Sequence, residues 1–215
     1  MKIKKVLRFL MLAAIAVSGM LLTSCLDDRY EPVPVKLSDV NGNYKARLVT
    51  SQGGKINEKI IDFDAKDSLI TFKNFPMKEV VKTIITDPAK ADTVLAHLGK
   101  VEYTIKFNSK LNTEQNVVEL ALEPQVMAFQ IPVEGVTKNI SVKMTAKQKG
   151  FYVGYDTSLR FAWEAERISV GGTDIVPYHT IKYEVPISIK NQIVVFLRQA
   201  GFNLRLPIFV LCQIE

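Results

Sequence analysis

Apolar and polar residues alternate without interruption along Val101-Glu102-Tyr103-Thr104-Ile105-Lys106-Phe107. Successive side chains of a β-strand point to opposite faces, so this stretch predicts a strand that buries Val101, Tyr103, Ile105 and Phe107 on one face. Comparable runs, rich in β-branched and aromatic residues, recur on both sides of it. They cover residues 44–49, 56–63, 68–72, 117–122, 126–133, 140–146, 151–155, 160–170, 173–178 and 181–189. A chain rich in β-strand is therefore expected.

Glycine pairs and one proline mark how these runs are connected. Gly53-Gly54 separates residues 44–49 from 56–63 and predicts a hairpin, because paired glycines accept positive φ. Gly171-Gly172 ends the run 160–170 in the same way. Pro186 interrupts 181–189, and a proline cannot donate a ladder hydrogen bond, so this run is predicted to be an edge strand.

Helical spacing replaces the alternation over about residues 76–99. The first half carries one apolar stripe, made of Met77, Val80, Val81, Ile84 and Ile85. Asp87 is suited to cap a second helix with Pro88 in its first turn, and Gly99 to end it. The inner face of that helix would be Ala91, Val94, Leu95 and Leu98. The predicted fold class is α+β with a β majority: a mainly antiparallel sheet or sandwich with a short helical hairpin insertion.

The first 24 residues have the pattern of a cleaved secretory signal. A start with four basic residues precedes an apolar run, 9–22, which is shorter than the roughly 20 residues that span a bilayer. The run closes on Leu22-Thr23-Ser24-Cys25, which resembles the lipobox of bacterial lipoproteins. This resemblance implies that the Cys25 thiol receives a diacylglycerol and becomes the new N-terminus, which tethers the protein to a membrane.

The residues after Cys25 predict a destination and a spacer. Asp27 and Asp28 resemble the acidic pair that marks surface-exported lipoproteins in Bacteroidetes. We therefore expect an outer-membrane lipoprotein of the cell envelope, and its exposure to the periplasm or to the cell surface stays open. Residues 25–36 read as the lipidated cysteine and an extended tether. Residues 37–190 would form a single β-rich domain.

The apolar segment 191–215 leaves two interpretations open: it supplies closing strands, or it is an extension foreign to the domain. It contains Cys212, which is the one cysteine left once Cys25 is lipidated, so no intrachain disulfide is expected. Removing the four basic residues of the signal from 28 leaves 24, against 22 acidic residues. This balance argues against nucleic acid as a partner.

Catalytic and metal-binding residues are not predicted. The two histidines, His97 and His179, have no ligand-spaced histidine or cysteine nearby, and no cofactor motif occurs in the sequence. Two carboxylate pairs, Asp62 with Asp64 and Glu164 with Glu166, each have period-two spacing that places both members on one strand face. A solvated sheet face is the favoured interpretation. A calcium site, or the acid and base of a hydrolase, is the alternative.

Aromatic residues offer a second set of ligand candidates. Trp163 alternates with Glu164 and Glu166, which places its ring on the core side of the strand. Tyr152 and Tyr155 remain ligand candidates, as do the two glutamates. A glycan-stacking platform is the chemistry that tyrosines of this kind would support.

Two tripeptides resemble the Asp-Ser/Thr-aliphatic motif for protein O-glycosylation in Bacteroidetes. They are Asp67-Ser68-Leu69 and Asp92-Thr93-Val94, with Ser68 and Thr93 as the modified residues. The alternative is ordinary turn and capping chemistry, in which these side chains bind nearby backbone groups.

Three blocks carry a resemblance to a known family. They are Ile70-Thr71-Phe72-Lys73-Asn74-Phe75-Pro76-Met77, Lys100-Val101-Glu102-Tyr103-Thr104-Ile105 and Lys149-Gly150-Phe151-Tyr152-Val153-Gly154. Together with the lipoprotein start they resemble an uncharacterised lipoprotein family of gut Bacteroidetes, the one with domain of unknown function 4840, over about residues 36–190. The resemblance implies an organism group and no chemistry.

The expected function is therefore a non-enzymatic binding or interaction module, anchored in the envelope, for a glycan or an envelope protein. Two alternatives stay open. One is a glycan- or peptide-directed hydrolase that uses a carboxylate pair. The other is a structural subunit of a surface assembly, in which segment 191–215 would be a donated strand.

Overall fold

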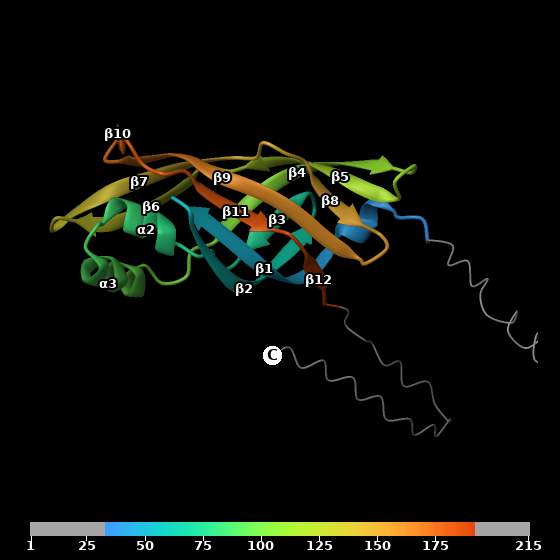
Figure 1. Ribbon diagram of the computed structural model, residues 1–215, viewed down its shortest axis with the longest axis horizontal. Coiled ribbons are helices and arrows are strands. Elements are labelled where there is room, and N and C mark those ends of the chain that lie inside the picture. Colours follow the sequence, from blue (N-terminus) through green and yellow to red (C-terminus); the bar gives the residue numbers. More distant parts are fainter. Residues whose placement is uncertain (1–32, 192–215) are drawn as a thin grey trace, which may run out of the picture.

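A computed structural model describes residues 33–191 of the chain, which carry twelve strands, two α-helices and one 3₁₀ helix (Figure 1). The strands are β1 (Gly42–Gln52), β2 (Lys55–Lys66), β3 (Leu69–Phe72), β4 (Tyr103–Asn112), β5 (Val117–Pro124), β6 (Met127–Val133), β7 (Val136–Thr145), β8 (Gly150–Val153), β9 (Ser158–Val170), β10 (Thr173–Asp174), β11 (Ile181–Val185) and β12 (Ser188–Lys190). The helices are η1 (Leu37–Val40), α2 (Lys78–Ile84) and α3 (Pro88–Leu98).

The strands pair antiparallel in the order β11-β1-β2-β3-β4-β5-β8-β9-β7-β6. Because β11 also pairs with β9, the path closes on itself and eight of the strands form a barrel. The predicted β majority, antiparallel pairing and helical hairpin are confirmed. The sandwich alternative is wrong, since β9 is bonded to β8 on one edge and to β11 on the other.

The edge-strand prediction for residues 181–189 is wrong for β11, whereas β12 is paired, among the described residues, along one edge only, with β1. Pro186 lies between β11 and β12, where the chain leaves the ladder. The segment before it, β11, has partners on both edges, because Tyr183 is paired with Thr50 of β1 and with Trp163 of β9. Because proline has no N–H to donate to a ladder, Pro186 marks the break between two strands here, and not an edge strand.

The barrel interior is filled by side chains. Tyr103, Ile105 and Phe107 are buried as predicted, with Lys106 exposed between two of them. Aromatic rings stack through the centre, as for Tyr44 on Phe63 with centroids 5.2 Å apart. The whole aromatic set is Tyr44, Phe63, Phe72, Phe75, Tyr103, Phe161, Trp163 and Tyr183. The interior is thus a packed core, and the core position predicted for Trp163 is confirmed.

The two α-helices pack at one end of the barrel, beside an extension of the sheet (Figure 1). There the second half of β9 pairs with β7, β7 pairs with β6, and α3 contacts β6. Asp87 caps α3 as predicted, since its Oδ1 accepts hydrogen bonds from the backbone N–H of Ala89 (2.9 Å) and Lys90 (3.1 Å). Gly99 ends the helix with φ 67°. The inner face is also as predicted, with Ala91 and Val94 buried.

Both ends of the described chain lie at the other end of the barrel, next to η1. The backbone N–H of Val35 donates to Asn116 Oδ1 in the β4–β5 turn (2.8 Å). At the C-terminal side, the N–H of Asn191 donates to the carbonyl of Asn43 at the start of β1 (2.7 Å). The helical end is therefore the end remote from both termini.

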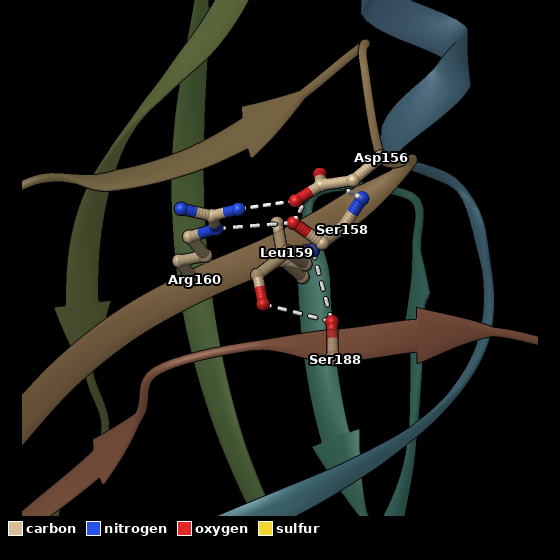
Figure 2. A network of polar contacts seen from close by, with 5 residues as sticks. All are labelled: Asp156, Ser158, Leu159, Arg160 and Ser188. Carbon is tan, nitrogen blue, oxygen red and sulfur yellow. Dashed lines mark hydrogen bonds and ion pairs between the residues drawn. The ribbon is translucent and has the colours of Figure 1, made fainter.

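Side chains complete the barrel wall near the termini (Figure 2). The hydroxyl of Ser188 in β12 accepts a hydrogen bond from the N–H of Leu159 in β9 (2.9 Å) and donates one to the Leu159 carbonyl (2.8 Å). In the turn before β9, Asp156 accepts hydrogen bonds from Ser158 and pairs with Arg160. This network fixes the turn and joins β9 to β12, where no backbone ladder between these two strands occurs within residues 33–191.

The charge on Asp156 makes a contribution to stability that depends on pH. Burial raises its pKa, but the hydrogen bonds from Ser158 and Arg160 outweigh burial and hold the pKa below its ordinary value of 3.8. A pKa lowered by folding means that this contribution is present above the unfolded-state pKa and is lost as the pH falls through the folded-state pKa.

We expect Asp156→Asn to lower the free energy of unfolding at pH 7 by about 1 kcal/mol, the usual value of such hydrogen bonds. The difference from wild type should shrink below about pH 4. Urea unfolding at pH 7 and pH 3 measures both. Asp67→Asn, at an exposed turn residue, is the matched control. A difference between Asp156→Asn and wild type that stays the same at both pH values contradicts the assignment.

Candidate functional site

A groove of about 310 Å³ lies on the outer wall of the barrel, over β1, β11 and β9. Two cross-strand rows form its floor. In one, Ser51 is paired with Lys182 and Lys182 with Glu164. In the other row Glu184 lies between Val49 and Ala162. The short side chains of these rows leave space between the long charged ones, which produces the hollow.

The segment between β7 and β8, residues 146–149, forms one rim of the groove. Gly150 allows β8 to approach β9 closely, because a Cβ at this position would lie 3.0 Å from Phe161 Cβ and 3.1 Å from the Arg160 carbonyl oxygen. Lys147 and Gln148 stand out before it and line the groove. Lys149 ties the rim to β5, the other strand that pairs with β8, because its Nζ lies 2.7 Å from Glu119 Oε2.

Glu164 is the charged residue that the groove buries. It is 8% exposed, and of the described residues it is the one buried residue with an ionisable carboxylate or ammonium group. Its partner is Lys147, whose side chain is 74% exposed and whose pKa is raised by the hydrogen bond with Glu164. Solvent screens the ammonium group of Lys147, so this side chain is free to move away from Glu164. The carboxylate would then accept hydrogen bonds from a ligand.

The predicted partner of Glu164 lies elsewhere. Lys143 is paired with Arg167 and Met144 with Ala165, so Glu166 is the extra residue of a β-bulge. Its carboxylate makes an ion pair with Lys143 (2.8 Å), which lowers the Glu166 pKa, and it lines a different hollow. The bulge interrupts the period of two, and it separates the two carboxylates into two hollows.

The other carboxylate pair remains together. Asp62 and Asp64 lie on the outer face of β2, on either side of buried Phe63, and line one hollow of about 230 Å³. Asp64 Oδ2 lies 2.7 Å from Lys73 Nζ. Over residues 33–191, no group of three or more His, Cys, Asp or Glu side chains is placed to hold a metal ion.

The two tyrosine candidates have opposite environments. Tyr152 is 3% exposed and lies inside the barrel, where burial raises its pKa. Tyr155 is 77% exposed, in the turn between β8 and β9. Tyr155 alone is therefore in a position to contact a partner through its ring, and neither residue lines the groove.

Both candidate glycosylation residues are exposed. Ser68 lies in the β2–β3 turn with φ 62°, and Thr93 lies on the outer face of α3 with its hydroxyl bonded to the Ala89 carbonyl (2.9 Å). Modification at either residue stays a prediction. The signal 1–24, Cys25, Asp27, Asp28 and most of the tail 191–215 lie outside the described residues.

Three charged residues of the groove were not predicted as site residues: Lys147, Lys182 and Glu184. The sequence shows strands 44–49, 160–170 and 181–189, but not which of them are neighbours. Because the groove depends on the register that closes the barrel, no local pattern identifies these residues.

The comparisons with known proteins give one match. A family described as "Domain of unknown function (DUF4840)" matches residues 39–170, which is more than half of the chain. No curated protein and no solved structure matches the chain. Among residues 33–191, no helix has the length and apolar character needed to cross a bilayer.

Proposed function

This chain belongs to the family with domain of unknown function 4840, and we propose that it is an outer-membrane lipoprotein that binds an envelope glycan or peptide. Binding takes place without turnover, in the groove over β1, β11 and β9. The observation that carries the proposal is Glu164, a buried carboxylate at the floor of the groove whose one ion-pair partner, Lys147, is largely exposed.

The position of the groove suits a protein tethered at Cys25. Residues 25–33 reach up to about 27 Å when extended, at 3.3–3.6 Å per residue. The chain then enters the barrel at the end that carries η1 and the start of β1. Val49 and Ser51 lie about 23 and 30 Å further along β1 from Gly42, at ~3.3 Å per residue. A membrane at the tether would therefore leave the groove accessible.

The charges of the groove favour a polar, uncharged ligand surface. Two ammonium groups, of Lys147 and Lys182, stand against two carboxylates, of Glu164 and Glu184. A strongly acidic or basic ligand would meet a like charge. Sugar hydroxyls and peptide amides can both donate to carboxylates and accept from ammonium groups. Val49 and Ala162 supply the apolar part of the floor.

The placement of the carboxylates argues against hydrolysis by the predicted pair on β9. A glycosidase of the usual kind needs an acid and a second carboxylate about 5–10 Å apart on one substrate. Glu164 and Glu166, the predicted pair on β9, line different hollows.

We expect Glu164→Gln to weaken binding of the ligand by about 10- to 100-fold, because a hydrogen bond to a charged group contributes about 1.5–3 kcal/mol. The ligand is first found by screening the protein on arrays of bacterial envelope glycans and peptides. Calorimetric titration of the best glycan or peptide then gives the affinities. Lys147→Met keeps the apolar stem, frees Glu164, and should bind equally well or more tightly.

Glu166→Gln is the matched control, because Glu166 is on the same strand, is exposed and is ion-paired with Lys143. It should bind within about twofold of wild type. Equal affinities of Glu164→Gln and wild type would place the ligand outside the groove. Turnover of the bound glycan or peptide by wild type, lost in Glu164→Gln, would make the protein a hydrolase.

A further inference from the structure

Three buried polar atoms, on side chains that pack at the helical end of the barrel, have no hydrogen-bond partner among the described residues. They are Tyr103 Oη, Trp163 Nε1 and Tyr183 Oη, and each residue is at least 97% buried. Buried polar side chains in folded proteins nearly always have partners, so each exception requires a physical reason. Three exceptions in one cluster of rings point to a shared cause.

The ring of Phe75 lies among these three side chains. Its centroid is 5.0 Å from that of Tyr103, 5.1 Å from that of Tyr183 and 6.2 Å from that of Trp163. A phenyl ring offers no conventional acceptor to the two hydroxyls and the indole N–H. The three rings that carry the donors therefore pack against a side chain that cannot accept from them.

Phe75 also separates this cluster from the surface. It belongs to the segment between β3 and α2, outside any strand, where its N–H donates to the Val101 carbonyl (2.8 Å). On its outer side it lines, with Met77 and Glu79, a surface hollow of about 190 Å³. A rotation of this one side chain would join the hollow to the three donors.

We propose that Phe75 is the plug of an internal binding site, and that Tyr103, Trp163 and Tyr183 hold there a small, neutral, planar molecule that carries a hydrogen-bond acceptor. The ligand replaces the phenyl ring, which sets its size at about one aromatic ring. Its acceptor is a carbonyl oxygen, whose lone pairs receive hydrogen bonds from these donors that Phe75 cannot accept. Trp163 and Tyr183 also contribute to the lining of the outer groove, but both residues are at least 98% buried, so the internal site lies on the inner side of the barrel wall.

Burial and the nearby Glu79 carboxylate disfavour an anionic ligand at the three donors. Burial raises the pKa of Tyr183, and the nearby Glu79 carboxylate raises it further, so the hydroxyl stays protonated and available as a donor. Burial likewise raises the pKa of Tyr103. The same Glu79 charge would repel an anion at this end of the barrel, although Lys59 and Lys78 also line the hollow outside Phe75.

Two isosteric probes test the proposal: acetophenone, which carries a carbonyl acceptor, and α-methylstyrene, which has the same shape without it. In Phe75→Ala, acetophenone should bind about tenfold more tightly than α-methylstyrene and about tenfold more tightly than it binds wild type. Calorimetry on the full chain gives the affinities. Trp163 is the single tryptophan, so its indole N–H gives one NMR signal, which should move downfield with acetophenone.

Phe63→Ala is the matched control. It removes a phenyl ring from the same core, in contact with Phe72 and Phe161 but not with the three donor side chains. Its cavity should bind both probes equally and leave the indole signal unmoved by the acceptor. Equal binding of the two probes by folded Phe75→Ala overturns the proposal. If that variant does not fold, wild type decides: a saturable downfield shift with acetophenone supports the site, and no shift at saturating probe overturns it.

Discussion

Replacement of Cys25 by alanine is expected to abolish incorporation of labelled fatty acid into the protein and its recovery with the outer membrane. The thiol is the group to which the diacylglycerol would be attached, and no other residue of the segment 22–25 can form that thioether. Two acyl chains give stable anchoring, whereas one chain binds a bilayer only marginally. The effect of losing the thiol on membrane anchoring should therefore be all-or-none. Labelling with an alkyne fatty acid, followed by membrane fractionation, measures both effects.

Cys212→Ala is the matched control, since Cys212 is the other cysteine of the chain. It should keep wild-type labelling and fractionation. If Cys25→Ala is processed and fractionates with the outer membrane as wild type does, the protein is not anchored through this residue. Protease treatment of intact cells distinguishes surface exposure from periplasmic exposure. It is applied to wild type and to an Asp27→Ala, Asp28→Ala double variant.

Local patterns in the sequence were sufficient for the strands and the helical hairpin. The alternation around Tyr103 is a property of one strand, and the structure buries Tyr103, Ile105 and Phe107, whereas Val101 lies before β4 and is half-buried. Asp87, Pro88 and Gly99 act within one helix: Asp87 bonds to backbone groups two and three positions away, and Pro88 and Gly99 stand at its first turn and its end. Such features depend on neighbours in the chain, which is why they can be read without knowing the fold.

The closure of the barrel could not be read in this way. It depends on β11 meeting both β1 and β9, and residues 42–52 are more than a hundred positions from 181–185. Pro186 predicted an edge strand, but a proline is found both in edge strands and at breaks between two strands. The sequence does not distinguish these two cases. The bulge at Glu166 similarly shifts a period that the sequence shows as regular.

The residues of the candidate site also divide into those that a local pattern identifies and those that only the fold brings together. Glu164 was a candidate from its strand alone, whereas Lys182 became one only when the register placed it opposite Glu164. The plug position of Phe75 depends on three rings from three different strands, and no spacing in the sequence relates them.

Ser188→Ala is expected to lower the free energy of unfolding by about 2–4 kcal/mol, because it leaves a buried N–H and a buried carbonyl of Leu159 without partners. A buried group that loses its partner costs about 1–3 kcal/mol, which is more than the net value of an ordinary exposed hydrogen bond. Urea unfolding followed by circular dichroism measures the change. The amide of Leu159 should also exchange with solvent faster in the variant.

Ile189→Ala is the matched control, on the next residue of the same strand, with its side chain exposed. It should change stability by no more than about 0.5 kcal/mol. If Ser188→Ala is as stable as this control, the hydroxyl does not hold β9 and β12 together. The expected difference is large because the β11–β9 ladder reaches only to Val185 paired with Phe161. Beyond Pro186, the joining of the barrel wall at Leu159 depends on the Ser188 hydroxyl, which serves as both donor and acceptor in place of a backbone neighbour.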